Sequence, residues 1–283
     1  MKGDLHCHTR ASDGSLTPAE LVRYAARTGV RCIAVTDHDH MAGVAEAQTE
    51  GKACGVAVVP GIEVSTLDGR SGRKAHLLCY RPARPEAMLG MCAATLRRRH
   101  EASLRILKKL SARYPIDEAV AARYASTDRP GGGTIYKQHI MAALMDMGYD
   151  TALYGRLYGE LLASGKGWAW EEPAYPDTRE AMRVIAQAGG VPVLAHPGLY
   201  GNFDLVEELC TMGLKGIEVS HPRQSAEASE RAEKLAERYG LLRTGGSDFH
   251  GRYASAPAPL GAGLAQDEAV LLLTAGGGPA GDA

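Results

Sequence analysis

The chain has 283 residues, of which 45% are hydrophobic and 23% charged, and its formal net charge is -1. This length can bury one large core or two modest ones, and the balanced charge excludes a generally basic nucleic-acid surface and an acidic disordered tail. The six cysteines include no C-x-x-C pair, the first residues are polar, and no stretch approaches the roughly 18 apolar residues of a membrane span, so we expect a cytoplasmic protein.

Alternating strand and helix signals open the chain. We expect strands at residues 2–7, 31–36 and 56–60 and helices at residues 18–28 and 41–53. The first helix begins at a capping box, in which Thr17 is the cap and Glu20 follows three residues later, and Gly29 marks its end. This alternation is typical of the βαβ units of a parallel sheet.

The strand pattern lapses between residues 81 and 176. Alanine, leucine, arginine and methionine recur there at helical spacing. We therefore interpret residues 81–176 as a helical insertion that caps a barrel made of residues 1–80 and 177–283. The insertion holds 14 Lys and Arg against 10 Asp and Glu, so it is the cationic part of the chain.

The alternation resumes at a second capping box, which runs from Asp177 to Glu180. A helix follows, and the next strand lies in "VPVLAHPG". The remaining elements are expected as a helix at 203–212, a strand at 216–220, a helix at 225–239 and a strand at 241–245. Both ends of the chain thus predict an α/β fold with a largely parallel sheet.

Two histidines lie one residue apart in the first expected strand. Alternate residues of a strand share a face, so Asp4, His6 and His8 point the same way. The pair His6 and His8 is therefore set to bind one ion. On its own, an H-x-H pair is explained equally well by a metal site and by two structural, hydrogen-bonded histidines. Residues elsewhere in the chain decide between these two interpretations.

Further histidines lie in or beside other apolar runs, at positions 38, 76, 196 and 250, and we place them at the carboxyl ends of strands. In parallel α/β folds, ligands and catalytic groups gather at these ends. Asp13, Glu63 and Asp248 occupy comparable places. So many imidazoles and carboxylates exceed what a core can satisfy by hydrogen bonding, and they predict a multinuclear metal site.

These residues lie in motifs that resemble a known family. In order, "DLHCHT", "TDHD", "GIEVS", "AHPG" and "GSDFH" resemble the motifs of the PHP (polymerase and histidinol phosphatase) family. With the helical insertion and the downstream "GLLRTGGSDFHG", the chain is most similar to the TrpH-like branch, which includes nucleoside 3',5'-bisphosphate phosphatases. The resemblance implies a distorted (β/α)7 barrel, similar to a TIM barrel, with two to three divalent ions.

The resemblance also implies a set of metal ligands. The first ion is assigned to His6, His8, Glu63 and Asp248, the second to Glu63, His76 and His196, and the third to Asp13, His38 and His250. Many relatives hold a histidine where Asp13 stands, and carboxylate oxygen suits hard cations better than imidazole does. We therefore expect Mn²⁺, with Mg²⁺ or Zn²⁺ as alternatives.

A metal-bound hydroxide would attack the phosphorus in line while the ions stabilise the phosphoryl oxygens. The leaving oxygen needs a proton or an ion, and the catalytic candidates are Asp248, His250 and His221. Water on the third ion is another candidate, and His221 could instead be a structural loop histidine. Asp4, Asp37 and Asp39 could orient the ligand imidazoles.

The insertion offers candidate contacts for a second anionic group. In "DRPGGGTIYKQHI", Arg129 precedes a glycine-rich loop, and Lys137 and His139 follow it near the start of a helix. Basic side chains at a helix N-terminus can bind an anion, so we predict that these three residues and His221 contact the substrate. The alternative is a mobile loop with solvated charges. In the run 97–100, successive side chains fan around a helix, so at most one or two face a pocket.

Together these features predict a metal-dependent phosphomonoesterase that removes the 3'-phosphate from nucleoside 3',5'-bisphosphates, such as adenosine 3',5'-bisphosphate. A 5'-to-3' exonuclease on short RNA is the nearest alternative. Histidinol phosphatase fits less well, because the cationic amine of its substrate does not suit a cationic cap. A non-enzymatic binding module could dispense with metal ligands, whereas every ligand position here holds a competent residue. We expect a phosphorylated nucleotide or short RNA as partner, and neither duplex DNA nor a membrane.

Overall fold

The computed structural model describes residues 3–125, 133–255 and 258–275 of the chain. Seven strands form one sheet in the order of the sequence. They are β1 (Gly3–Cys7), β2 (Cys32–Val35), β3 (Ala57–Leu67), β4 (Lys74–Tyr80), β5 (Val191–Leu194), β6 (Gly216–Ser220) and β7 (Leu242–Gly245). Neighbouring strands pair in parallel, except that β4 runs antiparallel to both β3 and β5.

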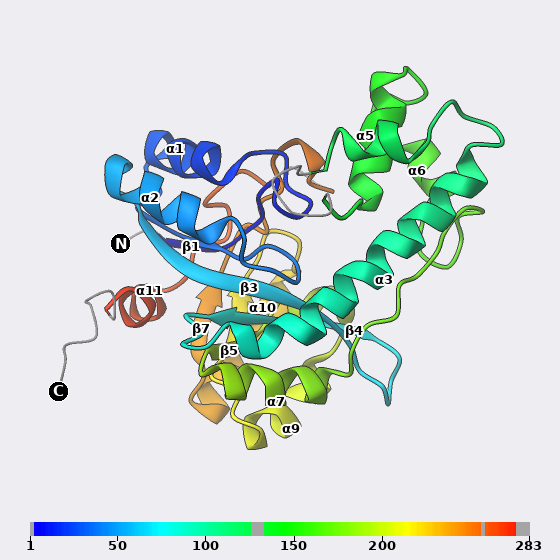
Figure 1. Ribbon diagram of the computed structural model, residues 1–283. Coiled ribbons are helices and arrows are strands. Elements are labelled where there is room, and N and C mark those ends of the chain that lie inside the picture. Colours follow the sequence, from blue (N-terminus) through cyan, green and yellow to red (C-terminus); the bar gives the residue numbers. More distant parts are fainter. Residues whose placement is uncertain (1–2, 126–132, 256–257, 276–283) are drawn as a thin grey trace.

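The sheet nearly closes into a barrel, because the segment after β7 returns to the side of β1. The N–H of His8 donates to the carbonyl of Phe249 (2.9 Å), and the N–H of Phe249 donates to the carbonyl of His6 (3.3 Å). Figure 1 shows the helices arranged around the outside of this sheet. The distorted, TIM-like barrel predicted from the sequence is therefore confirmed.

The antiparallel strand β4 departs from a regular alternation of strands and helices. Only the short segment 68–73 joins it to β3, so the two strands form a hairpin. In this turn Asp68 accepts hydrogen bonds from the N–H groups of Arg70 (3.2 Å) and Ser71 (3.1 Å). So short a connection has no room for the crossover that a parallel pair needs. The expected place of His76 at the end of a strand is wrong, since it lies near the beginning of β4.

The helices follow the predicted ones closely at both ends of the chain. They are α1 (Pro18–Thr28), α2 (Val44–Cys54), α3 (Glu86–Leu110), α4 (Glu118–Ala122), α5 (Lys137–Asp146), α6 (Arg156–Leu161), α7 (Thr178–Ala188), α8 (Pro197–Tyr200), α9 (Val206–Thr211), α10 (Ala226–Tyr239) and α11 (Asp267–Thr274), with 3₁₀ turns η1 (Phe203–Leu205) and η2 (Gly251–Tyr253). The capping box of α1 is present, and Gly29 ends that helix with a φ of 78°, which glycine adopts without strain.

The long helix α3 connects two apolar clusters. Near its start, Met88 packs with side chains of the barrel, including those of β4 and α7. Near its end, Ile106 packs in a separate cluster with side chains of α5 and α6. The described parts of the expected insertion, residues 81–125 and 133–176, are helical and hold no strand. The boundaries of the insertion at residues 81 and 176 stay a prediction.

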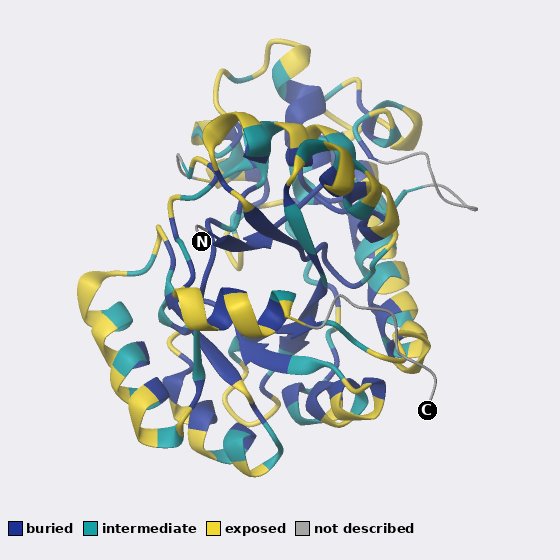
Figure 2. Cartoon of the chain, turned by 90° about the vertical axis from the view of Figure 1, so that its left-hand side faces the viewer, coloured by how far each residue is buried: buried dark blue, intermediate teal, exposed yellow. Residues whose placement is uncertain are grey.

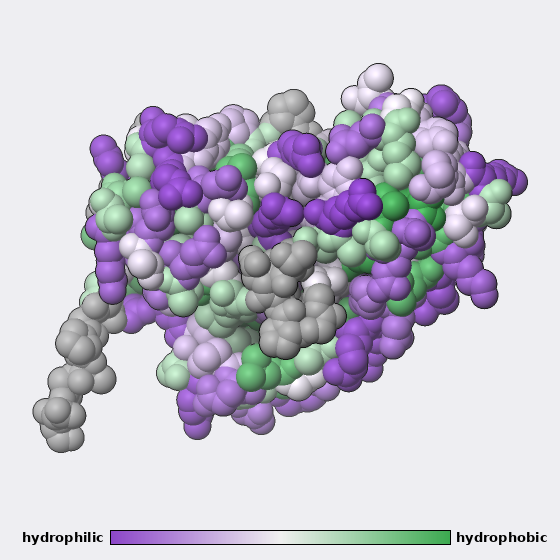
Figure 3. Space-filling model, turned by 45° about the horizontal axis from the view of Figure 1, so that its top comes forward, coloured by the Kyte–Doolittle hydropathy of each residue, from purple (hydrophilic) through white to green (hydrophobic). Residues whose placement is uncertain are grey.

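Burial follows the layers of the barrel. Figure 2 shows buried strands at the centre and helices that turn an exposed side outward. The face in Figure 3 is mainly hydrophilic, with apolar side chains in scattered patches. Over the described ranges, none of the helices combines the length and the apolar character that crossing a membrane requires.

Candidate metal centre

Polar side chains meet at the edge of the barrel where the parallel strands end. They are His6 in β1, His8 and Asp13 after it, His38 after β2, Glu63 within β3, His76 near the start of β4, His196 after β5, and Asp248 and His250 after β7. These are the nine residues that we predicted as metal ligands. The antiparallel direction of β4 brings His76 to this edge, and the length of β3 brings Glu63 there from inside the strand.

Glu63 lies at the centre of this group and contacts five imidazoles. Its Oε2 atom lies 3.3 Å from Nε2 of His6, 3.1 Å from Nε2 of His8 and 3.2 Å from Nδ1 of His38. Its Oε1 atom lies 2.7 Å from Nδ1 of His76 and 3.0 Å from Nε2 of His196. Each carboxylate oxygen therefore faces a different set of histidines, which is the arrangement that a bridging ligand between two ions requires.

Four overlapping groups of donor atoms surround Glu63, and within each group the atoms lie within 4.8 Å of one another. The groups are His6, His8, Glu63 and Asp248; His8, Asp13, His38 and His250; His38, Glu63 and His76; and His6, His196 and Glu218. The first group is the set predicted for the first ion, and the second adds His8 to the set predicted for the third. For the predicted second ion, His76 and His196 share contact with Glu63 but fall into different groups.

The donor set suits divalent cations. Nε2 of His6, both ring nitrogens of His8, Oδ1 of Asp13 and Nδ1 of His196 are buried and make no hydrogen bond with any described residue. Buried polar atoms in proteins almost always have partners, so these three histidines and Asp13 have lone pairs available for ions, His8 at one of its two ring nitrogens. Imidazole nitrogen together with carboxylate oxygen suits Mn²⁺ and Zn²⁺.

Hydrogen bonds fix which nitrogen of His6 and of His250 carries the proton. Nδ1 of His6 lies 3.2 Å from the Glu218 carboxylate, and Nδ1 of His250 lies 2.7 Å from the carbonyl oxygen of Asp248. Both oxygens only accept, so each Nδ1 must donate its hydrogen. The lone pair is then on Nε2, which in His6 faces Glu63 and in His250 lies 3.3 Å from Asp13. Both histidines are therefore oriented as metal ligands.

His221 has the opposite arrangement. Its Nδ1 accepts a hydrogen bond from the backbone N–H of Arg223 (3.1 Å), a group that only donates. In the neutral ring the hydrogen must therefore be on Nε2, which lies 3.5 Å from Oδ2 of Asp248. His221 thus presents an N–H donor where His250 presents a lone pair, and among our catalytic candidates it is the donor.

The carboxylates of the centre are ionised at neutral pH. Burial disfavours the charged form of Glu63, but His38 and His76 beside it hold its pKa well below the usual value. The pKa of Asp248 also lies well below its usual value, because His250 and His6 outweigh the effect of burial. Ionised oxygens of this kind attract divalent cations.

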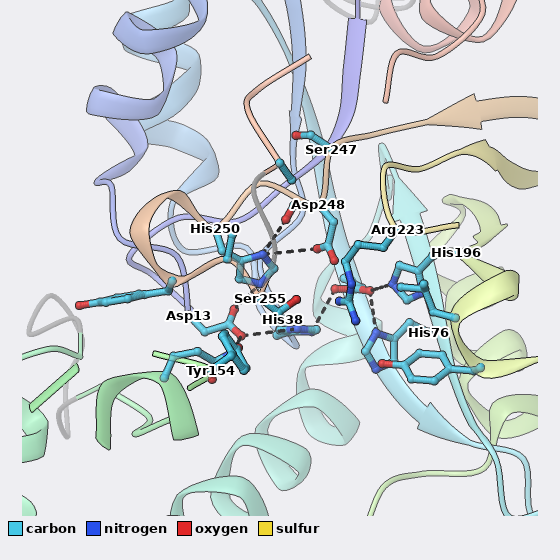
Figure 4. Close-up of a pocket in the computed structure, with 17 residues that line it drawn as sticks. Asp13, His38, His76, Tyr154, His196, Arg223, Ser247, Asp248, His250 and Ser255 are labelled. Atoms are coloured by element: carbon cyan, nitrogen blue, oxygen red, sulfur yellow. Dashed lines mark hydrogen bonds and ion pairs between the residues drawn. The ribbon is translucent and has the colours of Figure 1, made fainter. Parts of the chain in front are cut away.

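A cavity of about 150 Å³ opens over the centre. Figure 4 shows the Arg223 side chain reaching from the loop after β6 toward the residues that line it. The guanidinium of Arg223 makes no ion pair or hydrogen bond with another described side chain, although it shares the cavity with Glu63 and Asp248. Tyr154 and Tyr200 line the same cavity. The cavity therefore combines the donor groups with a free cation.

A second cavity, of about 240 Å³, adjoins the first and shares part of its wall. Lys137 lines it, as does Arg99 from the basic run of α3. His139 lines neither of these cavities, because its ring is fully buried between Tyr136 and Tyr253. Arg129, the third predicted contact besides His221, lies outside the described residues.

Sequence reasoning missed Glu218, which is fully buried and holds both His6 and the backbone N–H of His196 (2.8 Å). The signal was present, since "GIEVS" occurs at 61–65 and again at 216–220, with a glutamate at the third position each time. Both glutamates point into the barrel because the two strands share the same alternation. By contrast, Asp4 and Asp37 accept hydrogen bonds from serine or threonine hydroxyls and backbone N–H groups, not from imidazoles.

Comparisons with known proteins agree with this centre. The sequence profile of the PHP domain matches residues 4–240. A phosphoribosyl 1,2-cyclic phosphate 1,2-diphosphodiesterase from Eggerthella lenta is 42% identical, over 91% of this chain and 97% of its own length. A 3',5'-nucleoside bisphosphate phosphatase from Chromobacterium violaceum is 31% identical (87% and 86% covered), and a 5'-3' exoribonuclease from Haemophilus influenzae is 30% identical (88% and 90%). A crystal structure described as a metal-dependent phosphoesterase from Bifidobacterium adolescentis superposes with a TM-score of 0.86 at 30% identity, covering 96% of both chains.

Proposed function

This chain belongs to the PHP domain family and is a metal-dependent phosphoesterase, and from that premise we propose that it cleaves small ribose phosphates that carry a second phosphate. The observation that carries the proposal is the position of Glu63, whose two oxygens contact five histidines beneath a cavity that also holds the unpaired guanidinium of Arg223. A phosphoryl group is the anion that suits such a collection of cation sites and donors.

The leading substrate is phosphoribosyl 1,2-cyclic phosphate, because the relative named for it shares 42% of its residues and almost its whole length with this chain. Attack of water on the cyclic phosphorus breaks one P–O bond, passes a proton to the leaving sugar oxygen and leaves a phosphomonoester. A second water would release inorganic phosphate and leave ribose 5-phosphate. Both steps need a centre that places water and a protonating group on opposite sides of phosphorus.

The second candidate is the substrate class expected from the sequence, the nucleoside 3',5'-bisphosphates. One observation favours it: a third, open cavity of about 1110 Å³ meets the cavity over the centre and shares Tyr154, Ala254 and Ser255 with it. Tyr24 and Phe249 also line this cavity, and aromatic rings of this kind can stack on a base. The same cavity would admit a short RNA, as the exoribonuclease relatives suggest.

The four donor groups would hold two to three ions, with Glu63 shared between them. Divalent ions there would offset the charge of the phosphoryl oxygens and activate water as the nucleophile. We propose Mn²⁺ as the resident metal, because six imidazoles are combined with the harder oxygens of Asp13, Glu63 and Asp248. Zn²⁺ and Mg²⁺ are the alternatives that a metal analysis would distinguish.

The side chains around the ions have separate roles. His221 carries its hydrogen on Nε2, since its Nδ1 is already occupied by the N–H of Arg223, and this hydrogen faces Oδ2 of Asp248; we propose that it is donated to a leaving oxygen bound beside that carboxylate. The Arg223 guanidinium lies in the cavity and stabilises the charge that develops on phosphorus-bound oxygens. Asp248 lies between His6, His8 and His221, so it joins the first ion's ligands to the donor His221.

The test incubates the Mn²⁺-loaded protein with each of four substrates and measures the products by chromatography. The substrates are phosphoribosyl 1,2-cyclic phosphate, adenosine 3',5'-bisphosphate, a 5'-phosphorylated RNA dinucleotide and histidinol phosphate. We expect kcat/KM for the cyclic phosphate to exceed the others at least tenfold, and Asp248→Asn to lose this activity. Preference for the bisphosphate would select the second candidate. Fastest cleavage of the dinucleotide or of histidinol phosphate would overturn the proposal.

A further inference from the structure

The second cavity is rich in basic side chains that come from separate elements. Lys74 belongs to β4, Arg99 to α3 and Lys137 to the first turn of α5. The acidic residues in its wall are Asp13, which belongs to the metal centre, and Glu171. Glu171 is already paired with Arg105 and Lys109 on the outer side of α3. Among the described residues, the cavity therefore has more positive than negative charge of its own.

Arg99 is held in place before any ligand arrives. Its guanidinium donates to the Ser65 hydroxyl (2.8 Å) and lies 3.4 Å from Asp39, both next to the metal centre. The same guanidinium lies 4.9 Å from the ring centre of Tyr136 and 5.5 Å from that of Tyr175. Its Nε is buried and has no hydrogen-bond partner among the described residues. Arg99 thus presents a fixed, incompletely satisfied donor.

Lys137 has no carboxylate within ion-pairing distance among the described residues, and its ammonium lies 5.8 Å from the ring centre of Trp170. The pKa of Lys137 is lowered from 10.5 to about 8, mainly by burial and to a smaller extent by the neighbouring Lys74 and Arg99, against the opposing effect of Glu172. Lys74 itself is paired with Glu172 at 2.6 Å. A partly buried ammonium without a counter-ion among the described residues is costly, so an anion bound in this cavity would relieve that cost.

We propose that the second cavity binds the phosphate monoester of the substrate that is not cleaved, and that Arg99 and Lys137 are the residues that select it. This inference rests on the proposed function and assigns the selectivity to residues of the cap. A phosphate dianion offers three acceptor oxygens, which matches a planar guanidinium and a lysine ammonium converging from two helices.

The two cavities are direct neighbours. The cavities share Asp13, His38, His76, Gln138 and Tyr200 in their walls, so only one layer of side chains separates them. Within that layer, Gln138 donates a hydrogen bond to Asp13 (2.9 Å) and so joins the start of α5 to the metal centre. A ribose bound beside these shared residues would place one phosphoryl group in each cavity.

The selectivity test compares adenosine 3',5'-bisphosphate with adenosine 3'-monophosphate, which differ only in the second phosphate. We expect Lys137→Met and Arg99→Gln each to lower the ratio of their kcat/KM values at least tenfold. Lys137→Arg keeps the charge and should retain most of the ratio. Arg98→Gln is the matched control, because Arg98 is exposed on the same helix and should leave the ratio unchanged. A ratio within twofold of wild type in both Lys137→Met and Arg99→Gln would overturn the inference.

A binding measurement separates this inference from the proposed function. Calorimetric titration with ribose 5-phosphate and with ribose needs no turnover, and circular dichroism reports whether each variant is folded. We expect the wild type to bind ribose 5-phosphate at least tenfold more tightly than ribose and Lys137→Met to lose that difference. If ribose 5-phosphate binding depends on Lys137 but the protein hydrolyses no two-phosphate substrate, the proposed function is wrong and the phosphate site stands. If wild type and Lys137→Met bind ribose 5-phosphate equally well, the phosphate site is wrong and the proposed function stands.

Discussion

The backbone N–H of Arg223 donates to Nδ1 of His221 at 3.1 Å, and this single bond makes His221 a donor at Nε2. In His250 the hydrogen is on Nδ1 instead, since this atom faces the carbonyl oxygen of Asp248. The two histidines flank the same carboxylate, yet one offers hydrogen and the other a lone pair. Their substitutions should therefore have different consequences.

We predict that His221→Gln retains most of the bound metal, because it keeps a donor near the position of Nε2. His221→Ala lacks this donor and should lower kcat by about 100-fold. His250→Gln replaces the ring nitrogen's lone pair with an amide and should lower the bound metal by up to one ion per chain. Metal content by mass spectrometry and kcat on the best substrate check both. Equal metal loss in the two glutamine variants would contradict the assignment.

Removal of the Arg223 charge is predicted to act on the transition state. Arg223→Met should lower kcat/KM on the order of 100-fold, because the guanidinium faces the cavity without a counter-ion among the residues that the structure describes. Arg183→Met, on the exposed side of α7, is the control and should be silent. Steady-state kinetics at saturating Mn²⁺ measures the effect. A full loss of bound metal in Arg223→Met would show instead that the arginine supports the centre.

Glu218 is predicted to act through the metal ligands. Its carboxylate accepts from the His6 ring and from the backbone N–H of His196. Glu218→Gln should weaken metal binding by about 10–100-fold, since partners of this kind orient ligand imidazoles. Titration of the metal-free protein with Mn²⁺ measures the affinity. If excess Mn²⁺ restores kcat in Glu218→Gln, the residue positions ligands; if metal affinity is unchanged, this role is wrong.

The pH dependence of substrate binding should report on Lys137. Its pKa of about 8 lies below the ordinary 10.5, so the ammonium is charged below about pH 8 and becomes neutral as the pH rises through that value. KM for a two-phosphate substrate should therefore rise above about pH 8, while KM for adenosine 3'-monophosphate does not. Lys137→Arg stays charged and should lose this rise. If KM of Lys137→Arg rises with pH as it does in wild type, a group other than Lys137 causes the rise.

The hairpin turn offers a test of stability remote from the metal centre. Asp68 is almost fully buried and accepts from Arg179 (2.7 Å) and from the turn, and hydrogen bonds from Ser71 and Arg179 hold its pKa below the usual 3.8 despite its burial. Its charged form therefore stabilises the fold above about pH 4, and the effect is lost as the pH falls through the folded pKa.

We predict that Asp68→Asn lowers the free energy of unfolding at pH 7 by about 1–3 kcal/mol. The difference from wild type should shrink as the pH falls below 4. Urea unfolding at a series of pH values measures both, with Glu101→Gln on the exposed side of α3 as a surface control. A difference that stays constant down to pH 2.5 would exclude the charge of Asp68 as its cause.

The sequence predicted most of the barrel because its strands, helix caps and stop glycines are local signals. The alternation of β1 was enough to place His6 and His8 on one face. The direction of β4 was not predicted, since it depends on the short turn at 68–73 and on pairing with β5, which is distant in sequence. His76 does lie beside Glu63, but the sequence had placed it at the wrong end of its strand.

The residues of the cap were harder to predict. The direction of Arg99 depends on how α3 packs against the barrel and α5, which helical spacing alone does not fix. Arg223 lies in a loop whose course follows from the bond to His221. Glu218 was overlooked although its pentapeptide repeats that of Glu63, because only the closed barrel shows that both side chains turn inward.

The closure of the barrel has a consequence for how the chain folds. Of the four residues proposed as ligands of the first ion, His6 and His8 lie in or directly after β1 and Asp248 lies after β7, on the two sides of the seam where His8 and Phe249 pair, while Glu63 comes from β3. Both halves of that ion's coordination exist only when the two ends of the chain have met. An ion bound there adds its binding free energy to a contact between residues some 240 positions apart, so chelation should speed amide hydrogen exchange at this seam before it does so elsewhere. The metal ions would then stabilise the closed barrel as well as take part in catalysis.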